Sequence, residues 1–196
     1  MCLHLPRIRH SQQSFFEYLR EPHKTIVGLL YGAGLRLNEC LDLRILDVDF
    51  GRSEIMVRRG KGNKDRRTVL PDFVVPGLKA AISEAEKYFD QDQLDGIDHV
   101  YLPIDPVSGR KGRHHIHTKS VSRAISNAVK RAKIMKHVSA HVFRHSFATH
   151  LLENGYDIRT VQELMGHSNV NTTMVYTHVL NRGGRGVKSP LDQIER

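Results

Sequence analysis

The chain has 196 residues, of which 39% are hydrophobic, and this composition is sufficient for one well-filled core. The formal net charge of +9 favours a polyanionic partner, nucleic acid before a membrane. No run approaches the ~18 apolar residues that cross a bilayer, and the N-terminal stretch lacks the apolar core and cleavage site of a signal peptide. Cys2 and Cys40 cannot make a disulfide framework, so a reducing, cytoplasmic location is expected.

Residues 1–23 are expected to form an irregular lead-in, because Pro6, Pro22 and scattered charges interrupt any hydrophobic period. After them, the apolar pattern predicts a buried helix from Lys24, a break at "GAG" and a second short helix over "LRLNECLDL". The residues expected to face the core from these two helices are Ile26, Val27, Leu29, Leu30, Leu37, Cys40 and Leu41.

The pattern then changes, because Glu54 to Arg58 and Arg66 to Leu70 are short strand-like runs. The glycine-rich stretch "RGKGNKD" between them contains Lys61 and predicts the turn of a β-hairpin. A helix is predicted over Val75 to Phe89, and a long loop leads from there to the histidines of "HHIH".

The second half of the chain predicts four helices with recognisable ends. Thr118 is expected to cap the first, Gly155 to end the second in a left-handed conformation, and Asp157 and Gly166 to bound the third. The fourth is short and is expected to begin at Asn171, before a glycine-rich tail. The predicted fold is therefore mainly α with a small antiparallel β-sheet, an α+β architecture.

The second of these helices, in "SAHVFRHSFATHLLENG", carries an unusual set of nitrogen-bearing side chains. Phe143 and Phe147 are one turn apart and predict a packed face. His141, Arg144 and His145 share another face, where neighbouring Cβ atoms lie about 5–6 Å apart. A solvated basic face would explain this cluster, but a guanidinium fork also suits a phosphate and cannot ligate a metal.

The 13 histidines leave a metal site as an alternative, above all at His114, His115 and His117. Zinc sites usually need four ligands at tight spacings, often with cysteine, and the sequence has neither C-x-x-C nor H-E-x-x-H. Arg110 and Arg113, beside these histidines, would also repel a cation. A metal site therefore remains an alternative that the sequence does not favour.

Four further residues are candidates for phosphate chemistry, each with a plain structural alternative. Arg36 opens a helix, where backbone donors favour an anion, but a surface ion pair with Glu39 would also explain it. Lys61 in the hairpin turn could reach into a groove or serve solubility alone. For His167, just past a helix end, and Tyr176, in "MVYTH", capping and packing are the ordinary roles.

The order of these motifs is more specific than any one of them. "GAGLRLNE", "GKGNKDR", "HVFRHSFATHLLENG" and "LMGHSNVNTTMVYTH" follow one another along the chain. In this order they resemble the tyrosine recombinase family, the phage-integrase-like enzymes, over roughly Lys24 to Asp192. "GYDIRTVQELMGH" and "MVYTHVLNRGGRGVKSPLD" further resemble the integron integrases within that family. The implied organisation is a catalytic domain over residues 24–182 and a flexible C-terminal tail over residues 183–196.

The resemblance implies site-specific DNA recombination by strand cleavage and rejoining. Tyr176 matches the tyrosine that attacks a DNA phosphodiester and forms a 3′-phosphotyrosyl link, a reaction that needs neither a metal nor a cofactor. Arg36 and Arg144 match the two arginines that stabilise the charge on five-coordinate phosphorus. Lys61 matches the hairpin lysine proposed to protonate the departing 5′-oxygen.

Two histidines match further positions of the family. His141 matches one proposed to accept the tyrosine proton or to hold the phosphate, and His167 matches one that bonds a non-bridging oxygen. The resemblance leaves His145 a packing or supporting role. It gives Glu39 the role of orienting Arg36.

Two departures from the family pattern bear on activity. Family members usually carry a separate N-terminal domain, whereas residues 1–23 alone precede this match, and integron integrases carry an extra segment where "VYLP" here runs directly into "IDPVSG". The alternative to an active enzyme is therefore a truncated DNA-binding remnant with little or no turnover. DNA is the expected partner, no membrane is expected, and the C-terminal tail is expected to support self-association on DNA.

Overall fold

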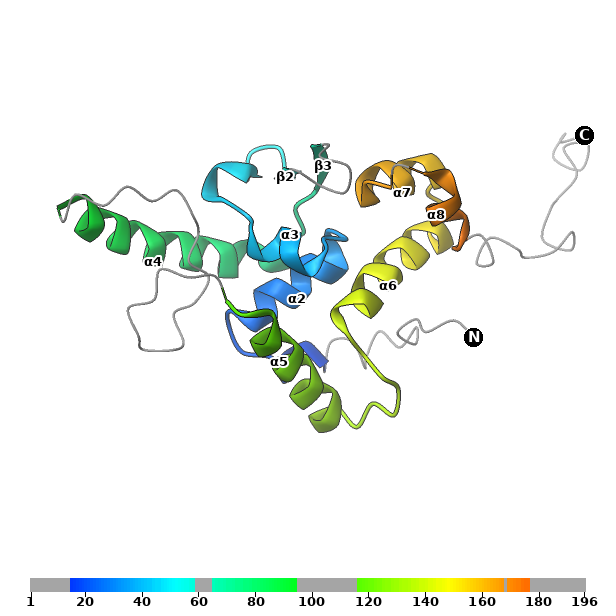
Figure 1. Cartoon of the computed structure of the whole chain (residues 1–196), viewed down its shortest axis with the longest axis horizontal. Coiled ribbons are helices and arrows are strands. Elements are labelled where there is room, and N and C mark those ends of the chain that lie inside the picture. The colour runs from blue at the N-terminus through cyan, green and yellow to red at the C-terminus, as the bar shows by residue number, and fades with distance from the viewer. Residues whose placement is uncertain (1–14, 59–64, 95–115, 168, 177–196) are drawn as a thin grey trace, which may run out of the picture.

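The computed structural model describes residues 15–58, 65–94, 116–167 and 169–176. In these ranges the chain forms helices around one small sheet, with the element labels of Figure 1. The predicted mainly α architecture with a small antiparallel sheet is confirmed. The hairpin turn with Lys61, most of the loop before His117 and the tail after Tyr176 lie outside the described residues.

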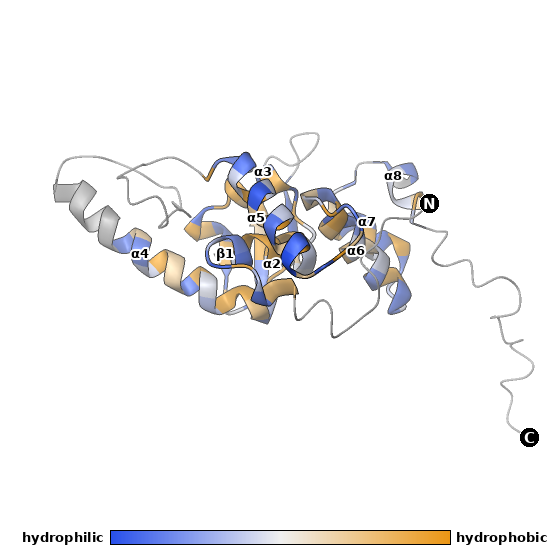
Figure 2. Cartoon of the chain, turned by 90° about the horizontal axis from the view of Figure 1, so that it is seen from below, coloured by the Kyte–Doolittle hydropathy of each residue, from blue (hydrophilic) through white to orange (hydrophobic). Residues whose placement is uncertain are grey.

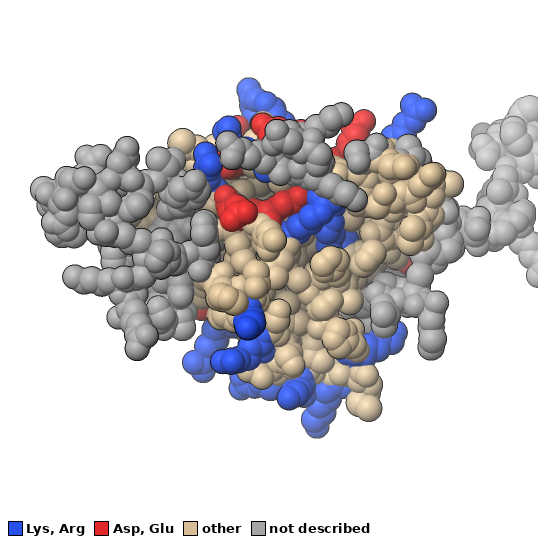
Figure 3. Space-filling view, viewed as in Figure 1, with Lys and Arg blue, Asp and Glu red and all other residues tan. Residues whose placement is uncertain are grey.

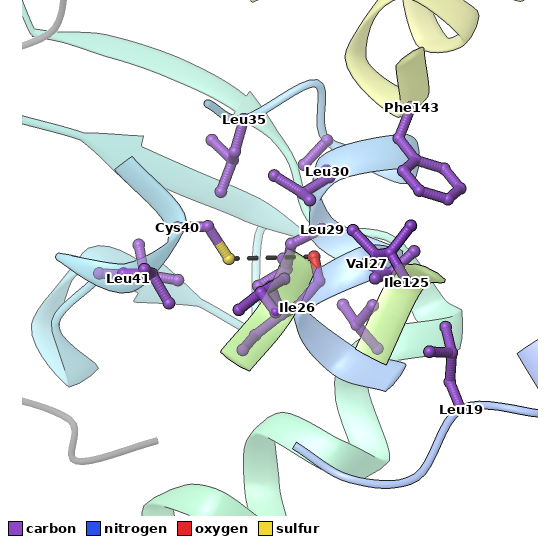
Figure 4. Close-up of a cluster of buried hydrophobic side chains, with 14 of the residues drawn as sticks. Leu19, Ile26, Val27, Leu29, Leu30, Leu35, Cys40, Leu41, Ile125 and Phe143 are labelled. Carbon is purple, nitrogen blue, oxygen red and sulfur yellow. Dashed lines mark hydrogen bonds between the residues drawn. The ribbon is translucent and has the colours of Figure 1, made fainter. Parts of the chain in front are cut away.

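Helix α2 (His23–Gly32) lies at the centre of the molecule, with α3 (Leu37–Leu41), α5 (Thr118–Arg131) and α6 (Ala140–Glu153) around it (Figure 1). A helix that is apolar on several sides is typical of a fully covered position. Figure 4 shows its core side chains packed against those of its neighbours. The α2 residues at 0% exposure are Ile26, Val27, Leu29 and Leu30, as the sequence predicts.

Cys40 of α3 also belongs to this core. It is fully buried, and its Sγ lies 4.0 Å from the carbonyl oxygen of Ile26, the contact drawn as a dashed line in Figure 4. Burial raises the pKa of the Cys40 thiol to about 12, and the charge of Glu39 adds to the rise. The thiol therefore stays protonated and acts as a small apolar group.

The N-terminal stretch packs more closely than the sequence suggests. Phe15 and Leu19 are 3% and 5% exposed and join the core around α2, where the rings of Phe15 and Phe143 lie 5.5 Å apart. The expectation of an irregular lead-in over residues 1–23 is therefore wrong for this part of it. Phe15 and Leu19 are one helical turn apart, a signal that the surrounding charges and prolines obscured.

The sheet has three antiparallel strands in the order β1 (Val48–Asp49), β2 (Glu54–Val57) and β3 (Arg66–Val69). Strands β2 and β3 confirm the predicted pair, and Ile55 lies opposite Thr68 in their register. Strand β1 was not predicted, because two residues are too few to show alternation. The hydroxyl of the buried Thr68 donates to the carbonyl of Ala33, the C-cap residue of α2, at 2.8 Å. This bond joins the sheet to the central helix.

The next two helices differ from the predictions at their ends. Helix α4 (Val75–Leu94) is longer than predicted and extends away from the other helices (Figure 1). Helix α5 has His117 as its N-cap rather than Thr118, because the His117 Nδ1 accepts from the backbone N–H of Lys119 at 3.1 Å. Threonine is the commoner cap, which is why the sequence favoured it. The side of α5 that faces the core carries the buried Val121, Ile125 and Ala128.

The outer side of α5 is basic. Figure 2 shows hydrophilic residues on this side, and Lys and Arg side chains gather over the same region in Figure 3. The exposed basic residues of the helix are Lys119, Arg123, Lys130 and Arg131. This surface agrees with the polyanionic partner that the net charge favours. Among the described residues, no helix is long and apolar enough to span a membrane.

Helices α7 (Ile158–Met165) and α8 (Val170–Met174) follow α6 and close the described chain. Asp157 and Gly166 bound α7 as predicted: the Asp157 carboxylate accepts two backbone N–H groups, and Gly166 has a φ of 61°. Helix α8 begins earlier than predicted, with Asn169 rather than Asn171 as its cap. Both asparagines precede the same apolar turn, so the sequence did not separate them.

Helix α6 connects two apolar clusters. Phe143 packs in the main core around α2, whereas Phe147 packs in a second cluster with residues of α7. The two phenylalanines confirm the packed face that the sequence predicts. The second cluster consists of Phe147, Ala148, Leu152, Val161, Met165 and Tyr176. Helix α7 and Tyr176 are thereby fixed to the same helix that carries the predicted cationic face.

Candidate active site

The candidate site forms where helix α3 begins, and Glu39 lies at its centre. Arg36 is the N-cap residue of α3; its backbone N–H donates to Glu39 Oε2 at 2.8 Å and its Nη1 donates to Oε1 at 2.6 Å. The predicted pairing of Glu39 with Arg36 is confirmed. The Arg36 side chain is 30% exposed and that of Glu39 only 9%, so the guanidinium of Arg36 can still meet a ligand from solvent.

Arg66 on strand β3 is a second cation on the same carboxylate, and the sequence did not single it out. Its Nη1 and Nη2 donate to the two Glu39 oxygens at 2.9 and 2.6 Å, and its Nε donates to the carbonyl of Leu164 in α7 at 3.0 Å. Arg66 therefore joins the sheet, α3 and α7. One signal was available: Arg66 and Arg67 are adjacent on a strand, so they point to opposite faces and one must meet the protein body.

Arg144 of α6 is buried, so the interpretation of its helix face as solvated is wrong at this position. Its Nη1 donates to the carbonyl of Gly34 and its Nη2 to that of Met165. Its Nη1 also lies 3.7 Å from Glu39 Oε2, so the same carboxylate meets both Arg36 and Arg144. Burial and the charge of Arg36 lower the pKa of Arg144 to about 10, which still leaves it charged at neutral pH.

The local charge balance favours an anion. Burial alone would raise the pKa of Glu39, but hydrogen bonds from Arg66 and from the Arg36 backbone outweigh it and hold the pKa at about 2. The ionised carboxylate thus lies among three guanidinium groups, those of Arg36, Arg66 and Arg144. Positive charge is in excess, and such a local excess attracts phosphate or another anion.

Two glycines in the left-handed region let the backbone approach these arginines. Gly34 has a φ of +66°, and a Cβ there would lie 2.4 Å from the ring of Phe147. Gly166 has a φ of +61°, and a Cβ there would lie 2.6 Å from Cδ of Arg66. A side chain at either position would be strained and would displace a neighbour, so the sequence places glycine at both.

His167 follows Gly166 at the end of α7 and borders Arg144. Its Nε2 lies 3.5 Å from Nη2 of Arg144, and its Nδ1 lies 2.9 Å from Oγ1 of the buried Thr173. Because a guanidinium only donates, Nε2 accepts in this arrangement and Nδ1 donates to Thr173. Gln162 donates to the His167 carbonyl at 3.0 Å, so both α7 and α8 fix this residue.

Tyr176 follows α8 and lies beside the same groups. It is 5% exposed, its ring is parallel to that of His167 with centroids 6.5 Å apart, and its hydroxyl lies 2.7 Å from Nδ1 of His145. Burial raises the pKa of the Tyr176 hydroxyl, and the charges of Arg144 and Arg36 oppose the rise. The structure therefore brings Tyr176, His167 and both arginines together.

The two histidines at the start of α6 are both exposed. His145, which was expected to pack or to support, has its Nδ1 against the hydroxyl of Tyr176, a supporting contact that also touches the candidate nucleophile itself. His141 is exposed one turn earlier and influences the site through its charge, which lowers the pKa of His145. Lys61 lies outside the described residues.

Metal ligation has no support in the part of the chain that the structure describes. There, no group of three or more His, Cys, Asp or Glu side chains could hold a metal ion. His117 uses its Nδ1 to cap α5, and His114 and His115 lie outside the described ranges. The chemistry at hand is a cationic site for an anion beside a tyrosine hydroxyl.

The order of the motifs and this geometry agree with the comparison to known families. The model of the phage integrase family matches residues 6–182. The chain belongs to the phage integrase family. An "Integrase/recombinase" of Escherichia coli is 43% identical over 203 residues, which cover 90% of this chain and 60% of that relative. This member of the family therefore spans about 60% of the length of the relative.

Solved structures of two recombinases share the fold of this chain. The crystal structure of XerA recombinase aligns with a TM-score of 0.69 at 36% identity, over 91% of this chain and 61% of that one. XerH site-specific recombinase, in a pre-cleavage complex with its difH substrate, aligns with a TM-score of 0.67 at 24% identity, over 90% and 50%. The expected catalytic-domain fold is confirmed. The finer kinship with integron integrases stays a prediction, because these relatives carry broader or different descriptions.

Proposed function

We propose that this chain is the catalytic part of a recombinase that cleaves and rejoins DNA through a covalent link to Tyr176. The observation that carries the proposal is the convergence of Arg36, Arg144 and His167 beside the Tyr176 hydroxyl. Arg36 caps α3, Arg144 lies in α6, His167 follows α7 and Tyr176 follows α8. The stability of any one of these helices does not require the four side chains to meet. Family membership and the DNA complex of XerH support DNA as the substrate.

In the proposed reaction, the Tyr176 oxygen attacks a DNA phosphorus, and a new O–P bond forms while the bond to the 5′-oxygen breaks. Arg36 and Arg144 bind the non-bridging oxygens, whose negative charge grows in the five-coordinate transition state. Each well-placed donor of this kind contributes roughly 10²–10³ in rate. Because the link to tyrosine preserves the phosphate ester energy, a 5′-hydroxyl can reverse the step without a nucleotide cofactor.

The remaining roles follow the family resemblance. Lys61 supplies the proton to the departing 5′-oxygen, and His167 binds the phosphate. His141 either accepts the tyrosine proton or holds the phosphate. For His167 to donate to a phosphate oxygen, its Nε2 must carry the proton. The Thr173 hydroxyl permits this change, because it can donate to Nδ1 as readily as it accepts from it.

A set of nicked duplexes with randomised sequence around the nick tests the proposal. Cleavage beside a nick releases a short strand, so the reaction cannot reverse and DNA stays attached to the protein. We expect an adduct that survives denaturation with the wild-type chain and none with Tyr176→Phe, which keeps the packed ring. An adduct with Tyr176→Phe would contradict the proposal. Salt-dependent binding without any wild-type adduct would favour the DNA-binding remnant instead.

We also propose the kinship with integron integrases. The alignment with the E. coli relative is longer than the whole chain, 203 against 196 residues, although it covers 90% of it. That relative therefore contains internal residues that this chain lacks, as expected for the extra segment of integron integrases. Since the family uses that segment to hold extruded bases, we expect this chain to prefer duplex sites over folded single-stranded ones in the adduct assay.

The remaining organisation is proposed on the same resemblance. The catalytic domain reaches residue 182, and residues 183–196 form a tail that passes to a neighbouring molecule on DNA, in the cytoplasm. Sedimentation with and without duplex DNA tests the tail. We expect association on DNA for the full chain and its loss when residues 183–196 are removed; one unchanged mass on DNA for both would contradict it.

A further inference from the structure

A histidine that the family resemblance leaves in a supporting role lies directly against the proposed nucleophile. His145 follows Arg144 on α6, and its Nδ1 lies 2.7 Å from the hydroxyl of Tyr176. The ring centroids are 5.3 Å apart and the ring planes are inclined by 54°. The contact joins two separate elements, α6 and the segment after α8, so local chain geometry does not impose it.

Tyr176 needs a partner that takes its proton. Burial raises the pKa of its hydroxyl, and the charges of Arg144 and Arg36 oppose the rise without cancelling it. A general base must lie within about 2.6–3.2 Å of the proton donor. Nδ1 of His145 meets that requirement before any ligand binds.

The surroundings of His145 favour the neutral form of its ring. Partial burial, the charge of His141 and the charge of Arg144 all lower its pKa. His141 and Arg144 lie on α6 with His145. Tyr176 faces the His145 ring from the segment after α8, and the positive charge of Arg36 on α3 lowers the pKa of that tyrosine. A neutral imidazole whose proton is on Nε2 presents Nδ1 as an acceptor.

We propose that His145 is a catalytic residue that orients the Tyr176 hydroxyl and accepts its proton during the attack on phosphorus. This role rests on the function proposed above. As the Tyr176 oxygen bonds to phosphorus, its O–H bond breaks and the proton moves to Nδ1, which leaves an imidazolium. The 5′-oxygen departs with a proton from Lys61. In the rejoining step, Nδ1 returns its proton to the Tyr176 oxygen.

The assignment gives different roles to His141 and His145, two of the three histidines of α6. His141 keeps the second of its two expected roles, holding the phosphate. Its side chain is exposed, and among the described residues the Tyr176 hydroxyl bonds to His145 rather than to His141. The two positions are one turn apart on α6, so both can face one phosphate and its nucleophile.

The contact can be tested without DNA by ¹⁵N NMR of the histidine rings, with His145→Gln used to assign the signal. The Tyr176 hydroxyl donates to the neutral ring and so favours it. In Tyr176→Phe this donor is lost, and we expect the Nδ1 resonance to move and the pKa of His145 to rise. An unchanged resonance and an unchanged pKa would overturn the contact, and the proposal with it.

The proton transfer is tested on a nicked duplex that the wild-type chain converts to an adduct. His145→Gln can hold the hydroxyl but cannot take its proton, and His145→Ala can do neither. We expect both variants to form the adduct about 10²–10⁴-fold more slowly. The matched control is His137→Gln, since His137 is exposed in the loop before α6; we expect the wild-type rate.

A duplex with sulfur in place of the departing 5′-oxygen distinguishes the role of the general base from that of the general acid. Sulfur leaves without a proton, so this substrate should restore adduct formation by Lys61→Ala. The slower adduct formation by His145→Gln should remain unchanged. The defect should shrink at high pH, where the tyrosine ionises without help. Wild-type rates for both His145 variants would overturn this role alone. A wild-type chain that forms no adduct, with the NMR contact intact, would overturn the proposed function and this role with it.

Discussion

Among single residues, Glu39 determines how the site is held together. Arg36 and Arg66 both donate to its carboxylate, and Arg144 lies 3.7 Å from it. Three guanidinium groups so close together repel one another, and the carboxylate offsets part of that repulsion. Arg144 in turn holds carbonyls from two separate segments with one planar fork, at Gly34 and Met165.

Arg144→Lys tests whether the planar guanidinium of Arg144 is needed for the reaction. Lysine keeps the charge, but one ammonium cannot hold two carbonyls and a phosphate oxygen in the same geometry. We expect adduct formation on a nicked duplex to slow by about 10²–10³-fold. Arg67→Lys is the control, because Arg67 is exposed on β3 and pairs with Glu54. Equal rates for Arg144→Lys and the wild-type chain would contradict the assignment.

Glu39→Gln tests the electrostatic balance through pH. The pKa of Glu39 is held at about 2 against an ordinary value of 4.5, so its ionisation stabilises the fold above pH 4.5. That contribution is lost as the pH falls through about 2. We expect thermal unfolding to show the wild-type chain losing stability over this range more steeply than Glu39→Gln. Parallel curves for the two proteins would show that Glu39 is not stabilised by its arginines.

Three secondary-structure elements, β3, α3 and α7, are connected through Arg66. Its side chain is 8% exposed, and it donates to Glu39 and to the Leu164 carbonyl at once. Gly166 allows this contact, since a Cβ there would meet Cδ of Arg66. Strand β3 is thereby fixed to α7, the helix that His167 follows.

Arg66→Gln and Arg67→Gln form a matched pair on adjacent positions of β3. Removing Arg66 takes the bidentate partner from the part-buried Glu39, which keeps Arg36, so we expect the loss of about 1.5–3 kcal/mol that is typical of hydrogen bonds to charged groups. Arg67 is exposed, so its loss should change the free energy of unfolding by about 0.5 kcal/mol or less. Urea unfolding of both variants measures this difference, and equal losses would contradict the connecting role of Arg66.

The sequence predicted the elements whose signals are local. The apolar spacing of α2 and α6 and the Asp157 and Gly166 ends of α7 can be read from a few neighbouring residues. Features set by distant contacts were missed. Strand β1 exists because β2 pairs with it, and the burial of Phe15 depends on the ring of Phe143.

The same division holds in the site. Glu39 and Arg36 are three residues apart, so their pairing was predictable from helix geometry. Arg66 lies 27 residues from Glu39, and His145 lies 31 from Tyr176, distances over which a sequence carries no contact information by itself. The ordered motifs nevertheless predicted that Arg36, Arg144, His167 and Tyr176 belong together, and the structure places them so.

For the whole molecule, the net charge of +9 and the basic outer side of α5 describe a surface suited to DNA. Binding that rests on phosphate contacts weakens with salt, with a slope of about −0.9 in the log–log plot for each phosphate neutralised. We expect a clear negative slope for Tyr176→Phe, which keeps every charge and cannot form an adduct. Affinity that stays flat from low to moderate salt would contradict DNA binding through this surface.

A crystal structure of Tyr176→Phe on a duplex that the wild-type chain cleaves would show the geometry of the attack. We expect donors of Arg36 and Arg144 on the non-bridging oxygens of a single phosphate. We also expect the ring at position 176 to point its edge at that phosphorus, at a distance that would bring the missing hydroxyl to about 3–3.5 Å. A scissile phosphate bound away from both arginines, or a ring directed elsewhere, would contradict the attack by Tyr176.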